Sequence, residues 1–111
     1  LVRAMPVGES VTSAILDLVR GARPGAPEAG AWLSETLVWG PGPRAAQALM
    51  LLVRARAVLQ GRLAPTLDDV AAMAAPVLRH RMALTFAARA RGASSDEVVA
   101  RLIEGSLLAA A

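Results

Sequence analysis

Residues 39–61 read WGPGPRAAQALMLLVRARAVLQG, and this stretch decides the fold. Two glycines and two prolines come directly before a single arginine, Arg44, and a long alanine- and leucine-rich run follows it. Pro43 suits the first position of a helix, because its missing N–H would have no partner there, and Gly42 suits the N-cap. Gly61 is a typical residue just beyond a helix end. The stretch therefore predicts a helix that begins at Pro43 and ends at Gly61.

The predicted helix has one apolar face toward the core. Apolar side chains recur at helical spacing along this face: Ala45, Ala48, Leu49, Leu52 and Leu59. The polar side chains lie largely off the face: Arg44, Gln47, Arg54 and Gln60.

The helical period predicts three further helices on either side of this one. The first runs from about Glu9 to Arg20, with Gly21 ending it. Its apolar positions share one face: Val11, Ile15, Leu18 and Val19. The next opens at "TLDD", where Thr66 and Asp69 form a carboxylate variant of the capping box.

Two features are expected in the last two helices. Pro76 must kink or break the helix that Thr66 opens, because it removes a hydrogen bond and crowds the previous turn. The last helix opens at "SSDE" with a capping box between Ser94 and Glu97. Apolar side chains line the inner faces of both helices: Val70, Ala71, Ala74, Leu78, Val98, Val99, Leu102 and Ile103.

The remaining segments are a loop and two short extended pieces. Residues 21–31 are rich in proline and glycine and predict a flexible loop. "ETLVW", Glu35 to Trp39, and "RMALT", Arg81 to Thr85, are candidate strands that can pair with each other. We therefore predict a mainly α fold, a small four-helix domain with a short two-stranded sheet, and one domain over residues 1–111.

Composition excludes several classes of protein. Hydrophobic residues make up 55% of the 111-residue chain and aromatic residues 3%, which favours helices built from alanine and leucine. There is no Cys and only one His, so we expect no metal site. All twelve basic residues are Arg, which excludes a phosphate-binding loop of the G-x-x-x-x-G-K-[ST] type. No apolar run is long enough for a membrane span, and no signal peptide is visible.

The chain offers no nucleophile next to a base. The acidic pairs Asp68–Asp69 and Asp96–Glu97 fall in the first turns of predicted helices, where they are expected to complement the helix dipole rather than act as general acids. His80, near a helix end, is expected to cap or pack rather than to catalyse.

Arg44 is the remaining candidate. It falls in the first turn of a helix, where free N–H groups and the dipole favour an anion, and its guanidinium suits phosphate oxygens. The alternative is an ordinary surface arginine near a turn. A cation at this end of a helix opposes the dipole by a few tenths of a kcal/mol, which hints that Arg44 is kept there for a partner.

These motifs, in this order, resemble the small C-terminal lid domain of MoxR-type AAA+ ATPases. "WGPGPRAAQALMLLVRARAVLQGR" is similar to the family's G-A-S-P-R-A segment, and "TLDDVAAMAAPVLRHRMAL" to its T-x-x-D-V…A-P-x-V-L-x-H-R segment. The likeness extends to "RARGASSDEVVARLI" and "MPVGESVTSAILDLVR". Two departures lie in the turn, where Pro41 stands in place of Ala or Ser and Gly42 in place of Ser. A third is Pro65, which precedes Thr66 where the family often has Pro after the Thr.

The resemblance implies a role for Arg44. In the family the lid packs over ATP bound by a preceding core domain, and the arginine of the "PR" segment is the sensor 2 residue that reaches the γ-phosphate. By motif position this residue is Arg44, with Pro43 and Gly42 beside the nucleotide. The implied cofactors are ATP and Mg²⁺ in the longer protein, with none bound to this fragment. The chain alone is not expected to hydrolyse ATP.

The resemblance also implies partners. They are the protein's own AAA+ core, neighbouring subunits of a hexameric ring, and a partner protein with a von Willebrand factor A domain, which a chaperone-like cytoplasmic ATPase would assemble or activate. Neither nucleic acid nor membrane is expected as a partner. The residues themselves leave one alternative, a small helical adaptor or nucleic-acid-binding module, since the net charge is +3. A nucleic-acid binder would align several arginines along one face.

Overall fold

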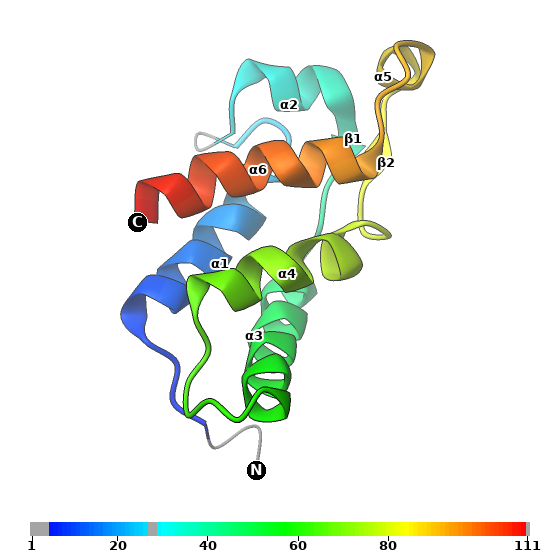
Figure 1. Cartoon of the computed structure of the whole chain (residues 1–111). Helices are drawn as coiled ribbons and strands as arrows, with labels where there is room; N and C mark the ends of the chain where they lie inside the picture. The colour runs from blue at the N-terminus through cyan, green and yellow to red at the C-terminus, as the bar shows by residue number, and fades with distance from the viewer. Residues whose placement is uncertain (1–4, 27–28, 111) are drawn as a thin grey trace.

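The computed structural model describes residues 5–26 and 29–110, with the side chains of residues 106–110 left out of the description. Within these residues the chain forms six helices and two strands (Figure 1). The helices are α1 Glu9–Gly21, α2 Ala31–Thr36, α3 Pro43–Leu59, α4 Leu67–Leu78, α5 Phe86–Ala90 and α6 Ser95–Ala110. The strands are β1 Leu37–Trp39 and β2 Ala83–Leu84.

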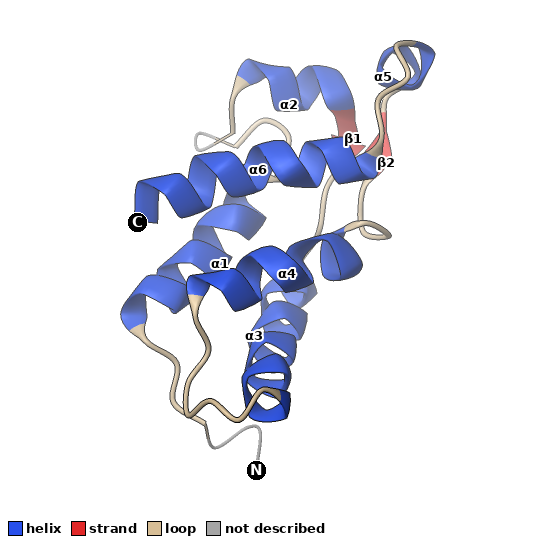
Figure 2. Ribbon diagram, viewed as in Figure 1, coloured by secondary structure: helices blue, strands red, loops and turns tan. Residues whose placement is uncertain are grey.

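The mainly helical prediction with a small sheet is confirmed (Figure 2). The four predicted helices correspond to α1, α3, α4 and α6. The two predicted strands pair antiparallel as expected, with Leu37 opposite Leu84 and Trp39 opposite Ala83. In the described part of the chain, no helix combines the length and the apolar character that crossing a membrane requires.

Helix α2 was not predicted, and it takes the first two residues of the expected strand 35–39. Glu35 and Thr36 are helical, and the Thr36 hydroxyl donates a 2.7 Å hydrogen bond to the Trp32 carbonyl one turn earlier. Leu33 and Thr36 are buried. A helix of only six residues spans too few turns for its apolar period to be recognised beside a proline- and glycine-rich loop. Residues 27 and 28 of that loop lie outside the described residues.

Helix α5 was not predicted either, because its five residues, like the six of α2, span too few turns for an apolar period to be recognised. Strand β2 covers only two of the five residues expected between Arg81 and Thr85. Thr85 instead caps α5: its hydroxyl accepts a 3.1 Å hydrogen bond from the Ala88 N–H and donates a 2.8 Å bond to the Glu35 carbonyl. These bonds tie the start of α5 to the end of α2.

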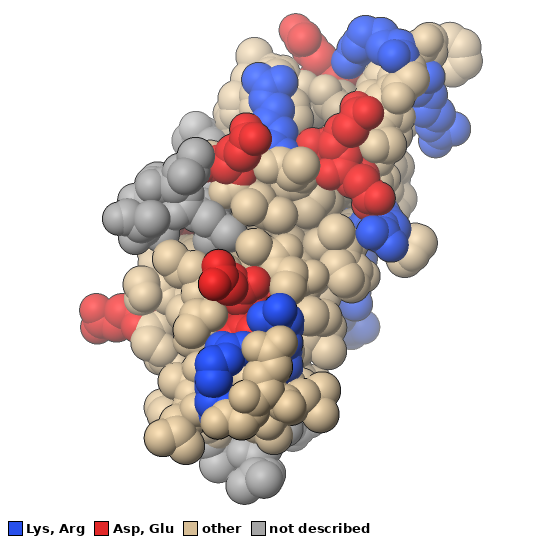
Figure 3. Space-filling model, in the orientation of Figure 1, with Lys and Arg blue, Asp and Glu red and all other residues tan. Residues whose placement is uncertain are grey.

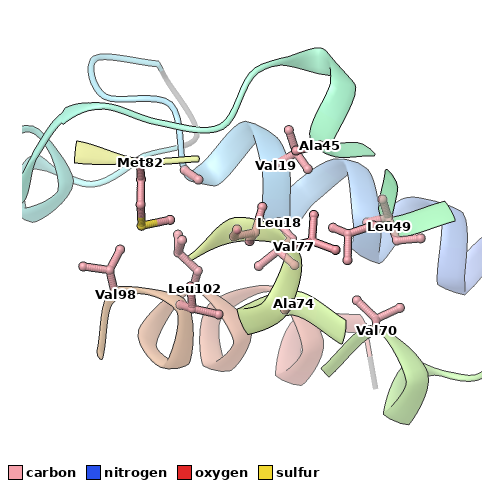
Figure 4. Close-up of a cluster of buried hydrophobic side chains, with 14 of the residues drawn as sticks. Leu18, Val19, Ala45, Leu49, Val70, Ala74, Val77, Met82, Val98 and Leu102 are labelled. Atoms are coloured by element: carbon pink, nitrogen blue, oxygen red, sulfur yellow. The ribbon is translucent and has the colours of Figure 1, made fainter. Parts of the chain in front are cut away.

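The core lies between α1, α3, α4 and α6, whose apolar side chains point toward one another (Figure 4). The buried residues come from these four helices and from the segment between α4 and β2, and they include Leu18, Leu49, Val53, Val70, Ala74, Val77, Met82, Val98 and Leu102. The inner face of α3 differs from the prediction at one end. Leu59 is 87% exposed, because the helix ends there. Val53 and Ala57 are buried instead, since they lie on the same face of the helix as Ala45, at intervals of four residues.

Helix caps agree with most of the sequence pattern. The capping box between Thr66 and Asp69 is present. At α6 the Ser94 hydroxyl accepts a 3.2 Å bond from the Glu97 N–H, which is half of the expected box. Of the two predicted effects of Pro76, a kink or a break, the break is wrong, since α4 is continuous through this residue. Pro76 is exposed and lies in the last turn, where the hydrogen bond it removes is one of the last of the helix.

Candidate functional site

Arg44 is the second residue of α3 and is exposed. It makes no hydrogen bond or ion pair with any other residue that the structure describes. Gly42 and Pro43, which precede it, are also exposed. The three residues predicted to face a nucleotide therefore lie together on the surface, and the guanidinium is free to meet a partner.

The N-terminus of α3 lacks the groups that usually neutralise a helix end. Its N-cap is Gly42, which has no side chain to accept a hydrogen bond, and there is no acidic residue in its first turn. By contrast, α1, α4 and α6 each carry at least one acid in the first turn. Together with Arg44, this leaves the start of α3 as a locally positive, uncapped helix end, which favours an anion.

The turn before Arg44 is held against the end of α1. A Cβ added to Gly40 would lie 2.0 Å from the carbonyl oxygen of Ala22, so only glycine allows this approach of the two backbones. Pro41 is buried beside it. The "GPGP" segment is thus anchored at Gly40 and Pro41 before it reaches the surface, which fixes where α3 begins and where Arg44 emerges.

Gly40→Ala is expected to destabilise the chain by about 1–3 kcal/mol, because the added methyl group must displace backbone rather than a side chain. Urea unfolding followed by circular dichroism measures this free energy. Gly105→Ala in α6 is the control, since a Cβ there meets nothing within 4 Å; it should leave stability unchanged or raise it by up to about 1 kcal/mol, because alanine favours the helix over glycine. A Gly40→Ala variant as stable as the unaltered chain would contradict the close contact between the turn and α1.

The other candidate side chains have structural or surface positions. His80 was expected to cap or pack, and it is exposed in the turn after α4, so it does not pack in the core. Asp96 forms an exposed 2.8 Å ion pair with Arg79, and Glu97 is exposed in the first turn of α6. Asp68 is exposed in the first turn of α4.

Asp69 has a role that the sequence pattern did not reveal. It is fully buried, and its carboxylate accepts hydrogen bonds from Arg56 at 2.5 Å, from Arg62 at 2.6 Å and from the Thr66 N–H at 2.7 Å. The hydrogen bond from Arg62 is the main reason that the pKa of Asp69 lies well below its usual range, against the opposing effect of burial. In Figure 3 acidic and basic side chains meet where the end of α3 approaches the start of α4.

This cluster of Asp69, Arg56 and Arg62 joins the end of α3 to the start of α4. Dipole complementation, the predicted role, applies to any acid in the first turn and cannot indicate burial. Arg56 and Arg62 are separated from Asp69 by a turn whose path is not evident from sequence spacing. The one useful signal was the capping box itself, which places Asp69 against the start of the helix.

A groove of about 600 Å³ lies along α3. It is lined by Ala46, Gln47, Met50, Leu51 and Arg54. Arg54 was predicted to lie off the core-facing side, and it does, yet its Nε atom is buried and has no hydrogen-bond partner among the described residues. A second hollow of about 410 Å³ involves Trp32 and Arg101, whose guanidinium carbon lies 4.1 Å from the Trp32 ring centre.

Comparisons with known proteins agree with this fold. The family model described as "AAA lid domain" matches residues 31–102. A crystal structure of a candidate ATPase from Cytophaga hutchinsonii is similar to the chain, with a TM-score of 0.85 and 24% identity. That match covers 93% of this chain and 31% of the other, so the chain spans about a third of that protein's length. No curated protein sequence matches. The family match covers most of the chain, including the turn at Arg44 and the Asp69 cluster. The chain therefore belongs to the AAA lid domain family.

Proposed function

We propose that this chain is the lid of a longer AAA+ ATPase, in which it closes over ATP bound by a preceding core domain and supplies Arg44 as a sensor of the γ-phosphate. The observation that carries the proposal is the position of Arg44. It is an exposed arginine without a partner among the described residues, at the start of a long helix that has neither a side-chain cap nor an acid in its first turn. A phosphate group fits such a position.

The chemistry required of Arg44 is limited to positioning and charge. Phosphoryl transfer spreads negative charge over the oxygens of the transferred group, and an arginine held at the right place stabilises that charge. ATP would supply the phosphoryl group. Residues 36–67 around Arg44 contain no acid, so carboxylates that bind Mg²⁺ would come from the core domain. Arg44 would therefore complete a site whose other parts lie elsewhere in the longer protein.

A MoxR-type identity is the finer part of the proposal. It is supported by the resemblance of the "GPGPRAAQAL" and "TLDDVAAMAAPVLRHR" segments to that family. On this basis the longer protein would form a hexameric ring and act as a chaperone-like ATPase that assembles or activates partner proteins, including ones with a von Willebrand factor A domain. Lid movement would couple the nucleotide state to those partners.

The proposal is tested by comparing nucleotide affinities of the longer protein before and after Arg44→Ala. We expect affinity for a non-hydrolysable ATP analogue to fall about tenfold, equivalent to about 1.4 kcal/mol, because a charge-assisted contact with the γ-phosphate is lost. Affinity for ADP, which has no γ-phosphate, should stay within about twofold. Isothermal titration calorimetry measures both.

Arg89→Ala is the control, since Arg89 is also exposed and lies on α5, away from the start of α3 (Figure 1). Equal affinities of the Arg44→Ala variant and the unaltered protein for both nucleotides would argue against a γ-phosphate sensor.

The nucleic-acid alternative has less support. Several arginines are engaged within the chain: Arg56 and Arg62 with Asp69, Arg79 with Asp96, and Arg101 over Trp32. Arg44 and Arg54 share α3, but the groove-lining residues between them are mostly apolar, so the two arginines do not form a continuous basic stripe.

A further inference from the structure

Two large aromatic side chains are exposed at one end of the molecule. The chain has only three aromatic residues, and the cluster of buried core residues contains none of them. Trp32 packs against the edge of that cluster, whereas Trp39 in β1 is 54% exposed and Phe86 at the start of α5 is 88% exposed. Val38, beside Trp39, is 62% exposed. The fold does not bury these three side chains, so they are available for contact with another molecule.

The small sheet brings the three exposed side chains close together. Trp39 lies opposite Ala83, and Phe86 follows Ala83 by three residues. At about 3.3 Å per residue, Phe86 lies within about 10 Å of the level of Trp39 along the strand direction. Val38 lies between these two levels. The three side chains therefore form one exposed apolar cluster around the sheet and the start of α5, and grouped apolar side chains of this kind mark interaction surfaces.

The backbone that carries Phe86 is held in place by hydrogen bonds. The Thr85 N–H donates a 2.8 Å bond to the Thr36 carbonyl, and the Thr85 hydroxyl, which caps α5, donates to the Glu35 carbonyl. Within α5 only Ala88 is buried, so these bonds do more than packing to fix the helix. A surface that is already ordered loses little entropy when a partner binds to it.

Arginines give the apolar cluster a positive rim. Residues 81–93 contain three arginines and no acid. Arg81 precedes β2 and Arg91 follows α5, and both are exposed. Figure 3 shows basic side chains gathered at the end of the molecule where α5 lies. Glu35 is an exposed acid beside this segment, but the arginines outnumber it. Positive charge around aromatic groups complements a partner that carries acidic side chains next to apolar ones.

The α5 end lies away from the first residues that the structure describes. In Figure 1 residues 5–8 are at the opposite end of the molecule from α5. A core domain that precedes the chain is therefore attached far from this surface, which leaves the surface accessible to a separate protein. From Trp39 the chain leads through the turn anchored at Gly40 and Pro41 to Arg44. Movement of the lid toward a nucleotide at Arg44 would thus carry the α5 end with it.

We propose that these residues form a docking surface, the α5 surface, for an acidic segment of a partner protein: Val38, Trp39, Phe86, Arg81 and Arg91. Apolar side chains of that segment pack on Trp39 and Phe86, and its carboxylates accept hydrogen bonds from the arginines. The proposal rests on the proposed function and extends it, because it gives the ATPase a place to hold the protein on which it acts. A single-stranded nucleic acid is less favoured, since it needs a positive groove along its backbone, and here Val38 and Glu35 interrupt the positive charge.

The test uses the 111-residue chain and a short fluorescein-labelled peptide of glutamate and leucine, with binding followed by fluorescence anisotropy. A peptide in which every glutamate is replaced by lysine is the matched probe. We expect the acidic peptide to bind at least about tenfold more tightly than the lysine peptide. Phe86→Ala should weaken the acidic peptide about tenfold, because the exposed aromatic anchor is lost. Since Phe86 is 88% exposed, this variant keeps the fold.

Two further variants separate the apolar and charged contributions. Arg91→Gln should weaken the acidic peptide about threefold and make its affinity less sensitive to salt. Leu63→Ala is the control, because Leu63 is 89% exposed in the loop after α3 and does not belong to the α5 surface. Its affinity should stay within about twofold of the unaltered chain.

Four results would overturn the proposal. Equal binding of the two peptides, or no binding of either, would show that the surface does not select acidic segments. An acidic peptide that binds the Phe86→Ala variant as tightly as the unaltered chain would place the contact elsewhere. Tighter binding of oligothymidylate than of the acidic peptide, lost in Phe86→Ala, would assign the surface to nucleic acid. Self-association of the chain that Phe86→Ala abolishes would assign it to a second copy.

The peptide measurement is independent of the γ-phosphate assignment, because it is made without nucleotide. Arg44→Ala should bind the acidic peptide within about twofold of the unaltered chain, since Arg44 lies outside the α5 surface. Failure of the sensor assignment would therefore leave the peptide result unchanged, and failure of peptide binding would leave the nucleotide affinities unchanged.

Discussion

ATP turnover by the longer protein is expected to fall by about 10²–10³-fold when Arg44 is replaced by alanine. The guanidinium is exposed and free of partners among the described residues at an uncapped helix start, so its charge is available to the transition state rather than committed to the fold. A loss of this size corresponds to about 2.7–4 kcal/mol of transition-state stabilisation. Steady-state hydrolysis at saturating ATP measures it.

Two further variants make the interpretation specific. Arg44→Lys should recover only part of the lost rate, because lysine keeps the charge but not the planar fork that fits two phosphate oxygens. Arg89→Ala should leave the rate within about twofold of the unaltered protein, because Arg89 lies on α5. Full ATPase activity of the Arg44→Ala variant would contradict the assignment of Arg44 to the catalytic site.

Asp69→Ala is expected to destabilise the folded chain by about 3 kcal/mol. The substitution removes the carboxylate that binds Arg56 and Arg62, and with it the capping box of α4. Loss of the cap alone contributes about 1 kcal/mol, and the charge-assisted hydrogen bonds contribute the rest. Urea unfolding of the 111-residue chain measures the change.

The adjacent Asp68 provides a matched control. It lies in the same first turn but is exposed, so Asp68→Ala should change stability by only a few tenths of a kcal/mol through the helix dipole. If Asp68→Ala and Asp69→Ala were equally mild, the Asp69 cluster would not stabilise the junction of α3 and α4.

The pH dependence has a definite direction. The pKa of Asp69 is lowered in the folded chain, chiefly by the hydrogen bond from Arg62, so its ionised form stabilises the fold at pH values above the unfolded pKa of about 3.9. This stability is lost progressively as the pH falls below about 4. Asp69→Ala should therefore show a flatter decline in stability over that acidic range than the unaltered chain.

The helical part of the fold could be predicted because its four long helices have strong periods and clear ends. Pro43, Gly61 and Thr66 mark helix ends through local chemistry that operates regardless of the rest of the fold. The short helices α2 and α5 carry no comparable signal. Their ends are set by contacts distant in sequence, such as the Thr85 hydroxyl donating to the Glu35 carbonyl.

The same distinction between local and distant contacts applies to the residues of the candidate site. Arg44 could be singled out because a proline and a glycine define its helix start within three residues. The burial of Asp69 and the unpaired Nε of Arg54 could not, because both depend on which side of a helix another segment covers. Sequence spacing places a residue on a helix face but does not say what lies opposite that face.

The most informative single measurement is the distance from the Arg44 guanidinium to the γ-phosphate in a structure of the longer protein bound to a non-hydrolysable ATP analogue. We expect a guanidinium nitrogen within about 2.7–2.9 Å of a γ-phosphate oxygen, the usual length of a charge-assisted hydrogen bond. An occupied nucleotide site with the lid closed over it and Arg44 directed into solvent would contradict the assignment of this chain as a lid that senses ATP.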